Sequence, residues 1–492
     1  VYDDVVDGML LKSEIFDVFG KPWNLPDIPL SPGKTFRKNF ILPELGQPPL
    51  GSYRLEYRVV DKDGQAVSKV GELILHRVRP AKFANEFLID SPFGTHITSN
   101  SEMPAVARKL GFTWARMFGL QWQSVEREKG LWNFDGMDKT IDNIINSKMC
   151  ILGILEGVPV WARSWIMPNP APKGYNNWHA KNVPPKNNDD FGEYAKRIAE
   201  RYKGKIQAFE TWNEPFLPGF LNKGFENGKY IHPSPEEFFE MHKTAIKGIK
   251  SGNPDAEVVF NAGAHYHAPS DTWTKELFAK GIFDMIDAVS YHSYQPSGIG
   301  YPGDALYKAT EANSNPKNSK MQVWNTEGGP GPSDIRNFYR HSAPLGKTDK
   351  SAFWGDYLVR YYVSTLASGA NKFFLYLLYG WGDYTASYSM MNVDGRLHPC
   401  LTAFSNLAWH IEGRKYVKTH ELSPGIFAYF FEDKTGSVAV IISKGIARQE
   451  LTKIDSKIKV RDLFGNNLPL PTKLGDYAVF FEGEGLKSDE MI

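Results

Sequence analysis

The fold is decided by the stretch Ile206-Gln207-Ala208-Phe209-Glu210-Thr211-Trp212 and by the residues that follow it, Asn213-Glu214-Pro215. The stretch predicts a β-strand, and the polar residues behind it stand where that strand should end. A carboxylate placed directly after a buried strand is costly without a partner or a task. Pro215 has a fixed φ and biases the preceding Glu214 toward an extended conformation. We therefore expect Glu214 to be held in place for a chemical purpose.

Seven further strand-like runs lie in the central block of the chain, and helical stretches alternate with them. Helical periodicity is clear over residues 190–202 and 235–249. Continuous apolar strands that alternate with crossover helices indicate a parallel α/β sheet. Eight such units predict a closed (β/α)₈ TIM barrel. The predicted strands cover residues 93–96, 114–118, 150–156, 206–212, 257–262, 288–291, 322–326 and 373–379.

Alternating apolar and polar residues flank this block on both sides. Residues 53–60 and 71–75, separated by the turn Asp61-Lys62-Asp63-Gly64, predict a hairpin of a small β-sandwich. Apolar runs at 426–431, 437–442 and 477–481 predict a second β domain. We expect three regions, namely an N-terminal Ig-like β-sandwich region over 1–80, the barrel over 81–413 and a C-terminal β-sandwich domain over 414–492.

Charge and composition exclude several classes of protein. The formal net charge is +1, which argues against a nucleic-acid or anionic-membrane partner. No apolar run approaches the roughly 18 residues of a membrane helix, so we expect no membrane span. Cys150 and Cys400 are far apart and favour buried free thiols. The chain begins at Val1, and we expect a periplasmic or extracellular protein whose signal peptide has been removed.

A second acid follows the predicted strand over 322–326. Glu327 comes directly after that strand, and Gly328-Gly329 allow a sharp turn that leaves room for a ligand. Because reacting groups project from the carboxyl ends of barrel strands, Glu214 and Glu327 can point into one pocket. Two facing carboxyl groups can act as a pair in acid/base or nucleophilic chemistry. The alternative is that Glu214 caps a helix and Glu327 is a solvated turn acid.

Trp212-Asn213-Glu214-Pro215, together with Glu327, resembles the retaining β-glycosidases of glycoside hydrolase clan A. The likeness is greatest to family 39, spans roughly residues 93–417 and includes Trp114-Ala115-Arg116, residues 122–130 and Pro184-Pro185. It implies that Glu214 is the acid/base and Glu327 the nucleophile of an enzyme that cleaves a β-linked glycan through a covalent glycosyl-enzyme.

The same resemblance implies roles for the neighbours of the two acids. Asn213 would bind the sugar 2-hydroxyl, although a helix-capping Asn is the alternative. Arg116 would hydrogen-bond the nucleophile and keep it ionised, the alternative being a surface salt bridge. His292 and Tyr294 follow the sixth strand, where the clan places an aromatic or His near the nucleophile. Ring packing in the barrel explains these two equally well.

Aromatic residues and histidines at the predicted strand ends are further substrate-binding candidates. Trp381 resembles the clan aromatic beneath the cleaved sugar, and Trp161 opens a long loop where it could stack on a sugar or pack in the core. His96 and His265 could contact sugar hydroxyls. A metal site built from these two with His267 is disfavoured, because no carboxylate accompanies them at ligand spacing.

These patterns together predict a retaining glycoside hydrolase whose substrate is an oligosaccharide or polysaccharide. We expect no metal or organic cofactor, because two carboxylates and water suffice for the reaction. A catalytically silent carbohydrate-binding protein on the same barrel and a transglycosidase are the alternatives. The fold does not specify the sugar, the linkage, exo or endo attack, or the oligomeric state.

Overall fold

The computed structural model describes residues 8–17, 19–30, 48–97, 102–264, 268–294, 321–329, 350–379, 389–391, 397–444 and 447–491. The chain divides into two compact units, which we describe separately. One comprises Ala81–Asp334 and Tyr361–Ser389, and the other comprises Val1–Pro80, Ile335–Arg360 and Met390–Ile492. The division into regions at residues 80 and 413 stays a prediction.

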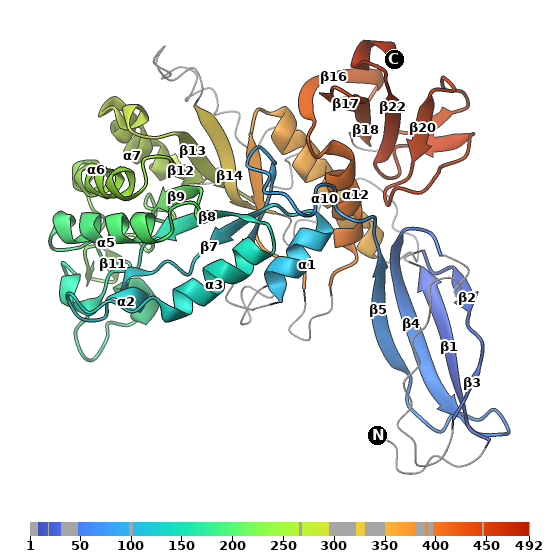
Figure 1. The fold of residues 1–492 in the computed structure, drawn as a ribbon, viewed down its shortest axis with the longest axis horizontal. Coiled ribbons are helices and arrows are strands. Elements are labelled where there is room, and N and C mark those ends of the chain that lie inside the picture. The colour runs from blue at the N-terminus through green and yellow to red at the C-terminus, as the bar shows by residue number, and fades with distance from the viewer. Residues whose placement is uncertain are drawn as a thin grey trace. The chain divides into compact units, whose positions relative to one another are not determined.

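Eight parallel strands close into a barrel in the order β6-β7-β8-β9-β12-β13-β14-β15. The predicted TIM barrel is thereby confirmed (Figure 1). The eighth strand ends at Leu375 rather than at residue 379. Leu377 and Leu378 are fully buried although they lie beyond the end of the strand. The apolar run over 373–379 therefore indicates buried residues as well as the strand itself. The bounds are β6 Phe93–Ile97, β7 Trp114–Met117, β8 Cys150–Leu155, β9 Ala208–Thr211, β12 Glu257–Ala264, β13 Ala288–Ser293, β14 Gln322–Gly328 and β15 Lys372–Leu375.

Helices lie on the outside of the barrel strands, as Figure 1 shows for α5, α6 and α7. The two helices predicted from periodicity are confirmed as α5 and α6. Ser234 begins α6 by accepting from the Glu237 amide while the Glu237 side chain accepts from the Ser234 amide, which satisfies free groups of the first turn. The bounds are α1 Met103–Leu110, α2 Trp122–Val125, α3 Asp135–Asn146, α4 Asn177–Ala180, α5 Asn188–Arg201, α6 Pro235–Gly252, α7 Ala268–Ala279 and α10 Lys350–Ala367.

Side chains fill the barrel in layers, as is usual for this fold. One layer is apolar and fully buried, and consists of Trp114, Cys150, Leu152, Ala208, Val259, Ala288, Trp324 and Phe374. Because side chains on a strand alternate between its faces, residues two positions further on also point inward. On five strands those residues are polar and fully buried, namely Arg116, Glu210, Asn261, Ser290 and Thr326. A polar layer therefore succeeds the apolar one toward the carboxyl ends of the strands.

The other unit is built on antiparallel sheets. The predicted hairpin is confirmed as β4 paired with β5, and the N-terminal sheet has the order β2-β1-β4-β5 with β3 beside β1. The C-terminal sheets have the orders β16-β17-β18-β22-β20 and β19-β21. The bounds are β1 Leu10–Asp17, β2 Pro22–Asn24, β3 Ile28–Pro29, β4 Gly51–Val60, β5 Gly71–Arg77, α12 Cys400–Ile411, β16 Lys415–Ser423, β17 Ile426–Asp433, β18 Gly436–Ser443, β19 Gln449–Leu451, β20 Ile458–Arg461, β21 Thr472–Leu474 and β22 Val479–Glu484.

Two smaller sequence expectations also agree with the structure. Cys150 and Cys400 are both buried and both free. Among the helices of the described ranges, none combines the length and the apolar character needed to cross a membrane.

A buried histidine in the barrel unit makes stability depend on pH. Burial lowers the pKa of His242, on α6, from 6.5 to about 3, while its Nδ1 is hydrogen-bonded to the Thr211 hydroxyl. In the unfolded chain the His242 imidazole becomes protonated near pH 6.5, whereas in the folded chain it stays neutral down to about pH 3. The free energy of unfolding therefore falls as the pH drops between those two values.

We predict that removing this histidine flattens the pH dependence of stability. Urea unfolding of the wild type and of His242→Asn, which keeps a polar group near Thr211, should be measured at pH 7 and pH 5. The loss of unfolding free energy per pH unit should be smaller in the variant, by up to about 1.4 kcal/mol. Equal losses in the two proteins would contradict the assignment.

Candidate active site

Glu214 and Glu327 meet at the carboxyl end of the barrel. Glu214 follows β9, Glu327 belongs to β14, and the two residues are only 9% and 8% exposed. One carboxylate oxygen of each and one ring nitrogen of His292 all lie within 4.8 Å of one another. Strands remote in sequence thus bring the two acids close together.

The backbone at Glu214 is not extended, and the expectation drawn from Pro215 is wrong. The φ angle of Glu214 is +47°, in the left-handed region that residues other than glycine seldom adopt. The Glu214 carbonyl accepts from the Leu217 amide at 3.0 Å, and its carboxylate is bonded to His292. These contacts outweigh the local effect of the proline, and strain of this kind is concentrated at functional sites.

His292 lies between the two acids. It pairs with Glu327 in the register of β13 and β14. Its Nδ1 is 2.8 Å from Glu214 Oε1 and 3.8 Å from Glu327 Oε2. Its Nε2 is buried and has no hydrogen-bond partner among the described residues. The imidazole therefore orients Glu214 more directly than it does Glu327.

Arg116 is fully buried and donates to three side chains. Its Nη1 is 2.8 Å from Glu327 Oε2, its Nη2 is 2.7 Å from Asn213 Oδ1, and its Nε is 2.8 Å from Glu210 Oε2. Burial alone would lower the Arg116 pKa, but the charges of Glu210 and Glu327 outweigh it and raise the pKa. Arg116 is therefore a permanent buried cation rather than the exposed partner of a surface salt bridge.

Tyr294 provides the second donor to Glu327. Its hydroxyl donates to Glu327 Oε1 at 2.5 Å. Burial, reinforced by the negative charge of Glu327, holds the Tyr294 pKa well above its usual value. The phenol therefore keeps its proton, and Glu327 accepts from a cation on one oxygen and from a phenol on the other.

His96 lies beside Arg116 and has no hydrogen bond to either acid in the described ranges. Its Nε2 is 3.0 Å from the Thr326 carbonyl oxygen, which can only accept, so this nitrogen carries the proton. Burial, followed by the charge of Arg116, holds the His96 pKa well below its usual value. Neutral His96 thus packs behind the cation, where its ring centroid is 5.1 Å from that of Phe118.

Trp161, another candidate, has no hydrogen bond to either acid in the described ranges. Trp161 donates from Nε1 to the Glu126 carbonyl at 3.1 Å and packs edge-on against Trp122, so its contacts in the described ranges are those of packing. His265 and Trp381 lie outside the described residues, and their roles stay predictions.

The polar layer below the acids was missed by the sequence analysis. Glu210 accepts from Arg116, Ser290 and Thr326, and more distantly from Asn261 at 3.4 Å. The sequence did contain a sign of this polar layer, because Glu210 is a charged residue within the otherwise largely apolar strand over 206–212. A charged side chain inside a buried strand requires a partner, and Arg116 of β7 is that partner.

Glu214, His292 and Glu327 are also the one group in the described ranges whose atoms are close enough to hold a metal ion. The guanidinium of Arg116, 2.8 Å from Glu327 Oε2, already neutralises one of the three. Its positive charge opposes a second cation at the same carboxylate.

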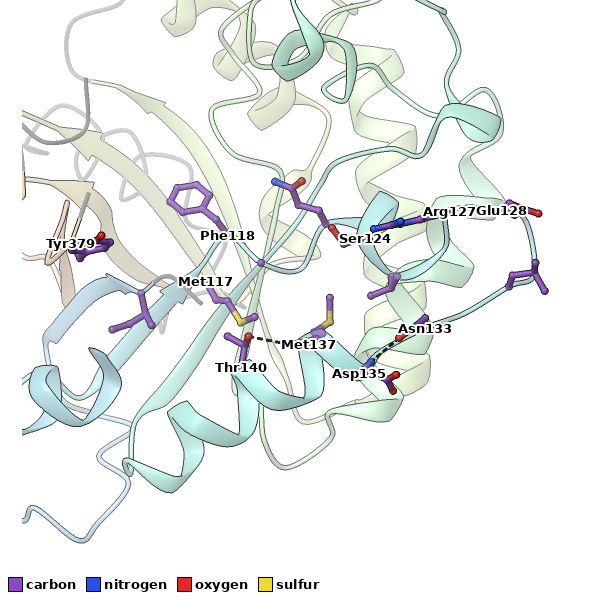
Figure 2. Close-up of a pocket in the computed structure, with 16 residues that line it drawn as sticks. Met117, Phe118, Ser124, Arg127, Glu128, Asn133, Asp135, Met137, Thr140 and Tyr379 are labelled. Atoms are coloured by element: carbon purple, nitrogen blue, oxygen red, sulfur yellow. Dashed lines mark hydrogen bonds between the residues drawn. The ribbon is translucent and has the colours of Figure 1, made fainter. Parts of the chain in front are cut away.

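A cavity of about 1280 Å³ lies at the ends of β6 and β7, and its lining residues do not include Glu214, His292 or Glu327. Figure 2 shows Met117 and Phe118 at one wall and Met137 and Thr140 of α3 at another. Phe118, one of the lining residues, has its ring centre 5.1 Å from the guanidinium carbon of the buried Arg116. Polar groups around the cavity are those of Gln121, Ser124, Arg127, Glu128, Asn133, Asp135, Thr140 and Tyr379.

Comparison with known proteins supports the fold. A family 39 glycoside hydrolase from the gut symbiont Bacteroides cellulosilyticus WH2 matches with a TM-score of 0.70 and 15% identity, over 98% of this chain and 96% of that chain. The family 39 enzyme from Xanthomonas axonopodis pv. citri matches with a TM-score of 0.51 and 13% identity, over 82% of this chain and 94% of that one. No family model matches the sequence.

The sequence motifs predict a resemblance to family 39, and the matches confirm it at the level of the fold. The chain therefore has the fold of these family 39 glycoside hydrolases, with an eight-stranded parallel barrel and antiparallel sheets in its terminal regions.

Proposed function

We propose that the protein is a retaining glycoside hydrolase that cleaves a β-linked oligosaccharide or polysaccharide. The observation that carries the proposal is the spacing of Glu214 and Glu327, with one oxygen of each inside a group that spans no more than 4.8 Å. Retaining enzymes hold their carboxyl groups about 5–5.5 Å apart, whereas inverting enzymes leave about 6.5–9.5 Å for a water molecule. The short spacing favours direct attack by one carboxylate.

The surroundings of the two acids differ and assign their roles. Glu327 accepts from Arg116 and Tyr294, and both donors stabilise its ionised form. The Glu214 carboxyl group has a single hydrogen-bond partner in the described ranges, His292. An ionised nucleophile and a proton-carrying acid need such unequal environments. We assign Glu327 as the nucleophile and Glu214 as the acid/base.

The proposed reaction has two steps. A Glu327 oxygen attacks the anomeric carbon while the glycosidic C–O bond breaks, and Glu214 gives its proton to the departing oxygen. Glu214, now a carboxylate, then takes a proton from water, whose oxygen attacks the same carbon and frees Glu327. Asn213, fixed by its bond to Arg116, is positioned to bind the sugar 2-hydroxyl. Both steps balance without an organic cofactor or a metal.

We predict that Glu327 is the residue labelled by a mechanism-based inhibitor. The protein should be incubated with a panel of 2,4-dinitrophenyl 2-deoxy-2-fluoro-β-glycosides of glucose, galactose, mannose and xylose. One of these should leave a fluoroglycosyl ester on Glu327, located by mass spectrometry of peptides, because the fluorine slows its hydrolysis. The sugar that reacts also identifies the substrate.

A variant separates the two roles in the same experiment. Glu214→Ala should still form the Glu327 ester, because dinitrophenolate leaves without a proton. Its turnover of glycosides with poor leaving groups should fall by about 10²–10⁴. Glu193→Ala, at an exposed acid of α5, is the matched control and should behave as the wild type. A label on any residue other than Glu327 would refute the assignment.

The cavity beside β7 supports a substrate longer than one sugar. It exceeds the roughly 300–1,000 Å³ of common ligand pockets, and Phe118 of its lining packs against the buried Arg116. Its hydroxyl, amide and charged groups of both signs suit a neutral polyhydroxylated chain. We assign it to the sugar units that precede the one attacked by Glu327.

This assignment predicts a defect that depends on substrate length. Arg127→Ala removes a cationic donor from the cavity wall and should raise KM for an oligosaccharide of the reactive sugar about tenfold. KM for the aryl glycoside of the single sugar should not change. Arg197→Ala, at an exposed arginine of α5, is the control. Equal effects of Arg127→Ala on both substrates would contradict a cavity that holds additional sugars.

A carbohydrate-binding protein without turnover and a transglycosidase remain the alternatives. The first would bind the sugar of the reactive glycoside but give no ester. The second would give the ester and transfer the sugar to an added acceptor sugar in preference to water. Product analysis with and without that acceptor separates these two from a hydrolase.

A further inference from the structure

Glu210 is a fully buried carboxylate inside the barrel and reaches neither of the two acids. It stands on β9, four residues before Glu214. An ionised carboxylate without access to water is costly unless its partners compensate for the lost hydration. The partners of Glu210 therefore indicate why it is present.

Both oxygens of Glu210 are fully engaged, and each faces a different kind of donor. Oε2 accepts from Arg116 Nε at 2.8 Å and also lies 2.6 Å from Arg116 Nη2, so two nitrogens of the guanidinium face this one oxygen. Oε1 accepts from Ser290 Oγ at 2.6 Å and Thr326 Oγ1 at 2.9 Å. One carboxylate thus ties β9 to β7, β13 and β14.

Those strands are the ones that carry the site. Thr326 immediately precedes Glu327, and Ser290 lies two residues before His292 on the same strand. The third strand contributes Arg116, whose remaining donor, Nη1, points to Glu327. Glu210 therefore fixes the backbone and the cation next to the reacting carboxylate while it stays outside the pocket itself.

The charges add a second effect to the geometry. Arg116 serves two carboxylates, Glu210 and Glu327, and both contribute to its raised pKa. A cation shared in this way stabilises Glu327 as an anion less than an exclusive partner would. An over-stabilised anion is a poorer nucleophile, so the sharing keeps Glu327 both ionised and reactive.

We propose that Glu210 is a positioning residue that anchors Arg116 and, by sharing its charge, sets the reactivity of Glu327. This inference rests on the proposed hydrolase function and deepens it. A purely structural residue would affect only the rate. The proposed role predicts that Glu210→Gln and Glu210→Asp also differ from each other in the pH dependence of hydrolysis.

The test compares Glu210→Gln and Glu210→Asp with the wild type on the aryl glycoside of the reactive sugar. Glu210→Gln removes the charge and places an amide against Arg116, so the guanidinium should pair more completely with Glu327. We expect kcat to fall about 10- to 100-fold, KM to change less than threefold, and the acidic limb of the pH–rate profile to move to lower pH.

Glu210→Asp keeps the charge but withdraws the carboxylate by one methylene group. The acidic limb should return to its wild-type position, with kcat only partly restored. Glu257→Gln, at another largely buried acid that lies at the amino end of β12, is the matched control. It should leave the acidic limb and KM unchanged.

The outcomes distinguish this inference from the function on which it rests. An active wild type with a Glu210→Gln variant of unchanged kcat and unchanged acidic limb would overturn the inference alone. If no glycoside of the panel reacts with the wild type, the function fails, and a crystal structure of Glu210→Gln then decides the positioning. Arg116 left in place there would overturn the inference, as would failure of both variants to fold.

Discussion

The site depends on a single guanidinium that has no contact with water. Arg116 is buried among Glu210, Glu327 and Asn213, and a cation in that position is stable only while its counter-charges are present. One cation between two carboxylates leaves the cluster with a net negative charge at the place where a sugar would acquire positive character. The same guanidinium holds the amide of Asn213, so one side chain joins the proposed nucleophile to a proposed substrate contact.

The barrel produces this arrangement by layering. Trp114, Ala208 and Trp324 face the interior in the apolar layer, and two residues later the same strands present Arg116, Glu210 and Thr326. Because every second residue of a strand faces the interior, the apolar layer is followed by a polar layer only two residues further along the same strands. Glu214 and Glu327 stand just beyond that platform. Packing beneath and hydrogen bonds above restrict the acids to a narrow range of positions.

Much of this was predictable from the sequence, for a physical reason in each case. Buried parallel strands leave continuous apolar runs, and all eight were located from them. Acids that directly follow such runs stand out, which is why Glu214 and Glu327 could be named. Arg116 was named from the resemblance to clan A. The end of β15 could not be located, because Leu377 and Leu378 remain buried after the strand has ended.

Features that depend on contacts between distant strands could not be predicted. The positive φ of Glu214 results from the bond to His292 and from its neighbours, against the bias of the adjacent proline. The proposed role of Glu210 depends on donors from β7, β13 and β14, which no local pattern connects. The contacts of Trp161 with the Glu126 carbonyl and with Trp122 likewise join separate segments, and its role in sugar binding stays a prediction.

The stereochemistry of the first product tests the central claim most directly, since it reports whether two acids at this spacing act by double displacement. Proton NMR spectra recorded during the first minutes of hydrolysis of a β-glycoside resolve the two anomers before mutarotation mixes them. Our account predicts that the β-anomer accumulates first and that the α-anomer follows slowly. An α-anomer formed first would contradict attack by Glu327 and would require a water molecule between the acids.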